Sequence, residues 1–274
     1  MAYSNLAQVL PLWREMNKTL YCGSLKPPCR PFIIGIGGSR SGAGKTTVAA
    51  ALLKYFTASP GPLKLWGAIK YTKTDFCSSL IDDRNIIEQA GKDTGKLLSA
   101  GAEQVLWLKG PREGIEETTS VAIERLHHLD GIIIEGNSAI EFSNPDIVIF
   151  ISAACGETEK PSSFRLIDHA DIIVFRRDSM PPTAHDKVYS ASSVYYDPED
   201  KTTEQELFEC MKAVIEERII ERIKQLLKQN AVNHRVSCPV ARSIADELKV
   251  PYSEVGRAAN ELKIKIMNCE LGCF

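Results

Sequence analysis

From Phe32 onward, short apolar runs alternate with longer stretches that carry apolar residues at helical spacing. This alternation is typical of a parallel sheet covered on both faces by helices. We therefore predict an α/β domain over residues 32–188. Its strands are expected at FIIGIGG (32–38), LWGAIKY (65–71), QVLWLKG (104–110), GIIIEG (131–136), DIVIFIS (146–152) and DIIVFRR (171–177), and its helices at 45–56, 85–102, 116–129 and 162–170.

The pattern changes on both sides of this domain. Residues 1–31 form a polar, proline-punctuated extension to which we assign no structure, and residues 189–203 read as a linker by composition. Residues 204–230 keep apolar positions at i, i+3, i+4 and i+7 over many turns, which predicts one long amphipathic helix.

The tail, residues 231–274, has the pattern of a small helix-turn-helix domain. A helix is predicted from Pro239 to Leu248, because proline suits the first turn of a helix. A second helix is predicted from Ser253, as N-cap, to about Leu262, and the run IKIMNC (264–269) is predicted to be a strand.

Composition and charge limit the classes of function. The 274 residues are 44% hydrophobic and 25% charged, with a net charge of -2, which is ordinary for a globular protein and gives no argument for binding nucleic acid. No apolar run approaches the roughly 18 to 20 residues needed to span a bilayer, and the N-terminus lacks the apolar core of a secretory signal. We expect a cytoplasmic protein without membrane contact, in which most of the eight cysteines are thiols.

The segment after the first predicted strand carries a phosphate-binding pattern. Gly44-Lys45-Thr46 ends a Walker A motif, although Ser39 stands where the pattern has its first glycine. In such a loop the backbone N–H groups wrap the phosphates, and the lysine adds a point charge at the terminal phosphates. The residues expected to hold a nucleotide are Ser41, Gly42, Ala43, Gly44, Lys45, Thr46 and Thr47.

Magnesium accompanies nucleotide in such sites and takes oxygen ligands. The Thr46 hydroxyl is one expected ligand. Glu135 ends the strand GIIIEG, and because a neighbouring strand end is the usual place for the carboxylate of such a site, we expect Glu135 to be the second.

The order of these motifs and two others resembles molybdopterin-guanine dinucleotide biosynthesis protein B, a family of P-loop GTP-binding proteins, over about residues 31–177. The family's second segment, of the form I-K-H-T-H-H-D-F, is similar to IKYTKTDF (69–76), with tyrosine, lysine and threonine in place of the histidines. Its G-K-D-S/T and A-G-A segments match 91–94 and 100–102, and its E-G matches Glu135-Gly136.

The resemblance implies a magnesium-dependent GTP-binding protein, with slow GTP hydrolysis, that assists molybdenum or tungsten cofactor biosynthesis. Its expected partners are the nucleotide and molybdopterin or a cofactor maturation protein, and a homodimer is a further expectation. Asp178 stands where guanine-reading P-loop proteins place an aspartate, but Phe175-Arg176-Arg177 does not reproduce their N-K-x pattern. Guanine preference is therefore implied by the resemblance alone.

Three further charged residues of these segments are candidates for contact with a second ligand. Lys70 leaves its strand at the carboxyl end, where open α/β sheets bind ligands, so it can meet a terminal phosphate or an anionic substrate. Asp75 and Asp93 can orient a substrate or magnesium-bound water, or they can be solvated loop carboxylates. We assign Lys45, Lys70 and Asp75 the catalytic role.

Three cysteines of the tail, Cys238, Cys269 and Cys273, can converge if the last strand folds back along the helices. Three thiolates suit an iron–sulfur cluster or zinc with a fourth ligand, for which His234 is a candidate, although small cysteines are also common in cores. The charges of the helix pair are balanced, so the phosphate contacts that dominate DNA affinity are weak there.

Two other functions remain open at this point. A P-loop kinase or ligase that uses ATP on a small molecule would need the same loop and Lys70. A sensor would instead combine the nucleotide domain with metal binding by the tail.

Overall fold

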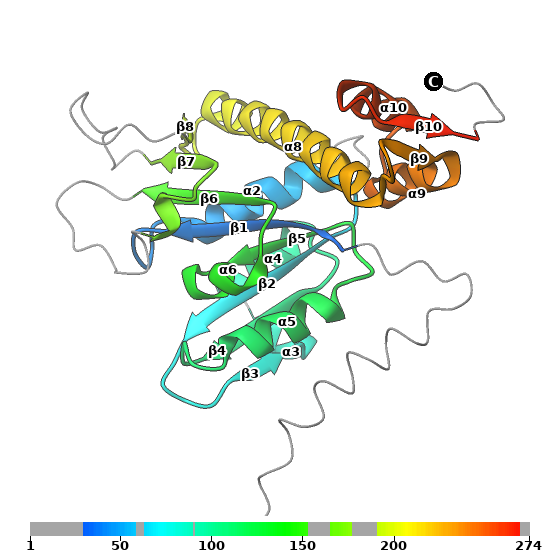
Figure 1. Cartoon of the computed structure of the whole chain (residues 1–274). Coiled ribbons are helices and arrows are strands. Elements are labelled where there is room, and N and C mark those ends of the chain that lie inside the picture. The colour runs from blue at the N-terminus through cyan, green and yellow to red at the C-terminus, as the bar shows by residue number, and fades with distance from the viewer. Residues whose placement is uncertain (1–29, 59–62, 90, 153–164, 177–190, 269–274) are drawn as a thin grey trace, which may run out of the picture.

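The computed structural model describes residues 30–58, 63–89, 91–152, 165–176 and 191–268. An eight-stranded sheet runs through it in the order β3-β4-β2-β5-β1-β6-β7-β8 (Figure 1). Every neighbouring pair is parallel except β3 and β4, which are antiparallel. The strands are β1 (Phe32–Gly38), β2 (Trp66–Lys73), β3 (Ser79–Ile81), β4 (Val105–Gly110), β5 (Gly131–Glu135), β6 (Ile147–Ser152), β7 (Ile172–Phe175) and β8 (Ser192–Tyr195).

Helices cover both faces of the sheet, because the central strands are apolar on both sides. Along β1 and β5 every residue is buried. One face packs against α2 (Lys45–Ala58), α3 (Arg84–Ile87), α4 (Asp93–Ser99) and the first half of α8 (Lys201–Asn230). The other packs against α5 (Ile115–Arg125) and α6 (Asn137–Ser143). The predicted α/β fold with a helix-covered parallel sheet is confirmed.

The segment predicted as a linker, 189–203, is not one in its described part. Residues 192–195 form β8, which pairs with β7 and extends the sheet beyond the predicted boundary at 188. The prediction failed because β8 is an edge strand: only Val194 is drawn into the core, and its neighbours are polar or exposed. Helix α8 then begins at Lys201, where Asp200 caps it by accepting from the Thr202 backbone N–H at 2.9 Å.

Helix α8 joins two hydrophobic cores. Leu207 and Met211 in its first half belong to the core under the sheet, whereas Ile223 and Leu227 belong to a separate small core. That small core lies within a C-terminal unit seen beside the end of α8 in Figure 1. The unit contains β9 (Arg235–Ser237), α9 (Cys238–Leu248), α10 (Tyr252–Glu261) and β10 (Lys265–Met267).

The C-terminal unit confirms the predicted helix-turn-helix order and corrects its details. Helix α10 is capped by Pro251, so Ser253 lies inside the first turn instead of at the N-cap. Strand β10 pairs in parallel with β9, a three-residue strand that was too short to predict from its pattern. Apart from the linker, the division of the chain into domains stays a prediction.

Three aspartates close the edge of the sheet at which the strands begin. Asp130, Asp146 and Asp171 immediately precede β5, β6 and β7, and each accepts a backbone N–H from the neighbouring strand region at 2.7 to 2.9 Å. Each also pairs with a cation of a C-terminal helix region, and these cations are Lys249, Arg222 and Arg218 in the same order.

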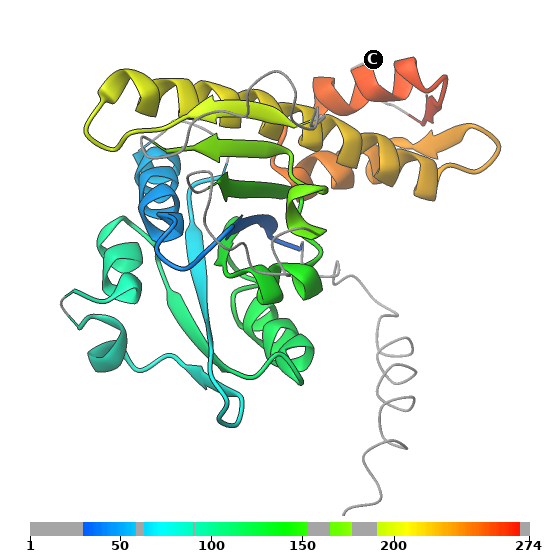
Figure 2. The same cartoon turned by 90° about the vertical axis from the view of Figure 1, so that its left-hand side faces the viewer.

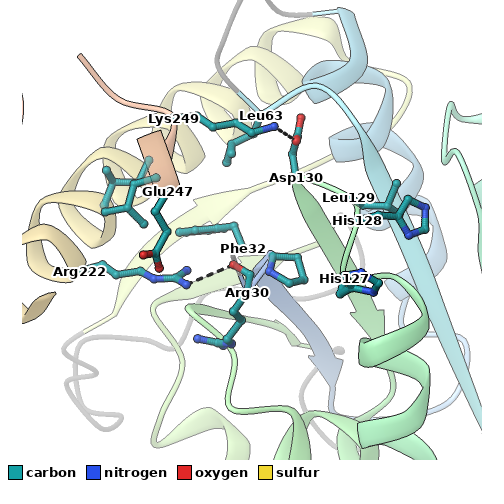
Figure 3. Close-up of a pocket in the computed structure, with 13 residues that line it drawn as sticks. Arg30, Phe32, Leu63, His127, His128, Leu129, Asp130, Arg222, Glu247 and Lys249 are labelled. Atoms are coloured by element: carbon teal, nitrogen blue, oxygen red, sulfur yellow. Dashed lines mark hydrogen bonds and ion pairs between the residues drawn. The ribbon is translucent and has the colours of Figure 1, made fainter. Parts of the chain in front are cut away.

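Figure 3 shows the cavity of about 140 Å³ at this edge, with Arg222 reaching the Arg30 carbonyl and Lys249 reaching Asp130. The cavity is bounded by the starts of β1 and β5, so it lies at the opposite edge of the sheet from the loop after β1. The ion pairs around it explain how the C-terminal unit is fixed to the sheet.

Replacing the buried carboxylate of Asp130 should weaken the fold in a pH-dependent way. Burial alone would raise the pKa of Asp130, but the N–H groups of Leu65 and Lys64 and the ammonium of Lys249 outweigh it and hold that pKa below its usual range. A depressed folded-state pKa stabilises the fold above the unfolded pKa of about 4, and this stabilisation is lost as pH falls through the folded value.

We expect Asp130→Asn to lower the free energy of unfolding by about 2 kcal/mol at pH 7, because backbone donors and Lys249 lose a charged acceptor. The difference in the free energy of unfolding between the variant and the unsubstituted protein should become steadily smaller below about pH 4. Urea unfolding between pH 7 and pH 3 measures it. A gap that stays constant over this range would contradict the assigned role.

Candidate functional site

The loop after β1 lies at the carboxyl edge of the sheet, which faces the viewer in Figure 2. Gly42 and Gly44 have φ angles of 78° and 94°, in the region that favours glycine, and α2 begins at the next residue, Lys45. Ser39 does not have a positive φ, and its N–H continues the pairing of β1 by donating to the Ile151 carbonyl at 3.1 Å. A serine therefore fits where the phosphate-loop pattern has its first glycine.

The first turn of α2 meets the end of β5 in a buried polar contact. The Thr46 hydroxyl donates to Glu135 Oε2 at 2.8 Å, and the Glu135 side chain is 2% exposed. Lys70, at the end of β2, donates to Glu135 Oε1 and lies 3.4 Å from the Thr46 hydroxyl oxygen. The structure thus brings together three residues that the sequence assigned to one site, from three elements far apart in the chain.

Asp93 joins this cluster from the start of α4. Its carboxylate lies 3.0 Å from Lys70 Nζ and 3.6 Å from Lys96 Nζ. Burial alone would raise the pKa of Asp93, but the hydrogen bond and charge of Lys70, with the charge of Lys96 and the Thr46 hydroxyl, keep that pKa below its usual range. Asp93 is therefore a charged member of the site at neutral pH.

Two residues of the site were not identified from the sequence. Asn137, the first residue of α6, accepts from Gly38 N–H and donates to Gly38 C=O, both at 3.0 Å, which fixes the exit of β1 at the loop. In the sequence, the indication of a role for Asn137 is its position two residues after Glu135.

Arg176, which follows β7, packs directly on the loop. A Cβ at position 44 would overlap its guanidinium and would lie 2.9 Å from its Cδ. A side chain at this position would displace the flexible end of Arg176, and the φ angle of 94° itself favours glycine. The arginine adds a positive charge to the loop from the far side of β6.

The remaining candidates are placed differently. Lys45 folds back on the loop, donating to the Arg40 carbonyl at 2.7 Å. Asp75 is exposed in the loop between β2 and β3, and within the described residues no hydrogen bond or ion pair joins it to Lys70, Thr46 or Glu135. Asp178 lies outside the described residues. Ala43 is buried, while Ser41 and Thr47 are exposed.

The metal site predicted for the tail is placed only in part. Cys238 begins α9 and is buried, and Cys269 and Cys273 lie outside the described residues. Within the described ranges, no group of three histidine, cysteine, aspartate or glutamate side chains is arranged to hold a metal ion. Iron–sulfur or zinc binding by the tail stays a prediction.

The sequence and the fold were compared with known proteins. No family model and no curated protein matches the sequence. Among solved structures, the signal recognition particle 54 kDa protein of Aeropyrum pernix K1, in complex with GDP, matches at 12% identity and a TM-score of 0.35, over 93% of this chain and 82% of that one. A match at this level carries no argument about fold or function.

The strand order and the loop themselves define the class of this chain as a P-loop α/β fold. The loop joins a central parallel strand to the N-terminus of a helix, and it packs beside the end of the adjacent strand β5. In the part of the chain that the structure describes, no helix is long and apolar enough to cross a membrane.

Removing Lys70 should destabilise the fold by leaving a buried carboxylate without its cation. We expect Lys70→Ala to cost about 3 kcal/mol, since Glu135 is almost fully buried. The double variant Lys70→Ala/Glu135→Gln should recover most of this loss, because no buried charge is then uncompensated. Chemical unfolding of the four proteins of this cycle measures the coupling, and strictly additive losses would show that the pair is energetically independent.

Proposed function

We propose that this chain is a magnesium-dependent P-loop nucleotide-binding protein whose nucleotide is GTP. The observation that carries the proposal is the 2.8 Å contact between the Thr46 hydroxyl and the Glu135 carboxylate, directly behind a loop with two left-handed glycines. A packing turn between a strand and a helix has no need of a buried carboxylate aimed at the first turn of that helix.

The phosphates would be held by the backbone N–H groups of the loop, by the N-terminus of the 14-residue helix α2, and by Lys45. Thr46 and Glu135 would hold magnesium, because hydroxyl and carboxylate oxygens are the hard donors that this ion takes. A bound magnesium ion would neutralise part of the negative charge of the phosphates. Lys70 contacts both of these donors and so lies within reach of the same phosphates.

We further propose, on the resemblance to molybdopterin-guanine dinucleotide biosynthesis protein B, that the protein acts in molybdenum or tungsten cofactor maturation. The support is that Lys70, Asp93 and Glu135, which come from three separate motifs of the resemblance, lie in one ion-paired cluster. The nucleotide and a pterin cofactor precursor are the ligands this proposal requires.

Removing the loop lysine should abolish nucleotide binding without unfolding the protein. In isothermal titration calorimetry with magnesium, we expect Lys45→Ala to lose at least about a hundredfold in GTP affinity, because Lys45 is the loop cation that would meet the terminal phosphates. Lys54→Ala, an exposed lysine on the same helix, serves as the control and should match the unsubstituted protein. Equal affinities for all three proteins would refute the nucleotide site.

The same titrations with ATP decide between the two enzymatic interpretations. Tight GTP binding without turnover agrees with an accessory protein. A preference for ATP, together with nucleoside diphosphate release that depends on a small carboxylate or alcohol, would instead indicate a P-loop kinase or ligase.

The contact between Arg176 and Gly44 predicts that Arg176 binds phosphate and not the base. Arg176→Gln should lower the affinity for inorganic pyrophosphate and the affinity for GTP by the same factor, about tenfold. Both ligands would lose one charge-assisted contact. Arg84→Gln, at an exposed arginine of α3, is the matched control. A loss confined to GTP, with pyrophosphate unaffected, would place Arg176 at the base.

A further inference from the structure

Trp107 stands on β4 next to the site, one strand outward from Lys70. In the pairing of β2 with β4, Trp107 lies opposite Lys70 and Lys109 lies opposite Thr72, so all four side chains rise from the same face. The indole N–H donates to the Thr72 hydroxyl at 2.9 Å, which fixes the plane of the ring.

Two lysines lie close to this ring. Lys109 Nζ is 3.6 Å from the ring centroid and Lys92 Nζ is 5.2 Å from it. Both lysines are half-buried. The face of an indole attracts cations, so the ring favours a position beside it for both ammonium groups.

These two charges have no anionic partner in the described structure. Among the described residues, no carboxylate lies within 4.0 Å of either Lys92 or Lys109. Asp93, the residue that follows Lys92 in the chain, is engaged by Lys70 and Lys96. Partly buried positive charge that is held by a ring and lacks a counter-ion is suited to an anion from outside the protein.

The position of this pair relates it to the phosphate loop. Lys92 directly precedes Asp93, whose carboxylate pairs with Lys70, and Lys70 reaches Thr46 at the start of α2. Side-chain contacts therefore lead from Thr46 through Lys70 to Asp93, and Lys92, the preceding residue, lies over the ring of Trp107. An anion bound there would lie beside the end of the loop that receives the terminal phosphate of a nucleotide.

We propose that Lys92 and Lys109, held by Trp107, form a subsite for the oxyanion of a second small ligand, either a phosphate or a carboxylate group. The ligand's place beside a nucleotide rests on the proposed function, whereas the oxyanion subsite itself does not. The structure thereby assigns the second ligand of this protein to the class of small anions and places it on the β2–β4 side of the loop.

The test uses the full chain with its loop filled by a non-hydrolysable GTP analogue and magnesium, so that added anions cannot enter the loop. Inorganic phosphate and malonate are then titrated by calorimetry. We expect saturable binding of at least one of them, and at least a tenfold loss of its affinity in Lys92→Gln/Lys109→Gln. Affinity for the GTP analogue should change less than twofold.

Two further double variants test whether a loss of anion binding comes from the two removed charges or from a disturbed fold. Lys201→Gln/Lys228→Gln removes two exposed lysines of α8 and should bind the anion like the unsubstituted protein. Lys92→Arg/Lys109→Arg keeps both charges on the ring and should retain binding within about threefold. Stronger binding of phosphate than of malonate would identify the anionic group of the second ligand as a phosphate. Stronger binding of malonate would identify it as a carboxylate.

The proposal is overturned if the unsubstituted protein shows no saturable anion binding, or if the glutamine pair binds as tightly as the unsubstituted protein. Failure of the proposed function has a different signature. In that case the GTP analogue does not bind, and the phosphate and malonate titrations are run without it, with the glutamine pair again expected to lose at least tenfold.

Discussion

The buried carboxylate of Glu135 is the charge around which the carboxyl edge of the sheet is organised. Its strand lies between β1 and β2, and the register sets Glu135 opposite Ile36 on one side and Lys70 on the other. The same placement aims it at Thr46 in the first turn of α2. An isolated buried carboxylate is costly, so Lys70 and Thr46 stabilise the fold independently of their proposed role in ligand binding.

The parts of the fold that follow from sequence are those with strong periodicity. The central strands are continuous apolar runs, and α2 and α8 are long helices, so their places could be predicted. Strands β3, β8 and β9 have only three or four residues, with half or more of each strand outside the core, and such segments resemble loops. The strand order, which puts β5 beside β1, is a long-range property that local patterns do not contain.

The candidate site shows the same division. Lys45, Thr46, Glu135 and Lys70 could be chosen because each stands at a strand end or in a motif. The roles of Asn137 and Arg176 depend on contacts with Gly38 and Gly44 from distant segments, which no spacing rule reveals. Asp93 could be named as a candidate from its motif. Its pairing with Lys70, however, depends on how α4 packs on β2, while Asp75 lies in an exposed loop.

The strand order also governs the order in which the protein can form during its synthesis. Strand β1 is complete at residue 38, yet both of its neighbours, β5 and β6, come after residue 130. At ribosomal speeds this interval is on the order of ten seconds. A nascent chain therefore carries an apolar strand, β1, that has no partner strand until β5 and β6 have left the ribosome. Until then this apolar segment has no native partner to bury it, so it is exposed to non-native contacts during synthesis.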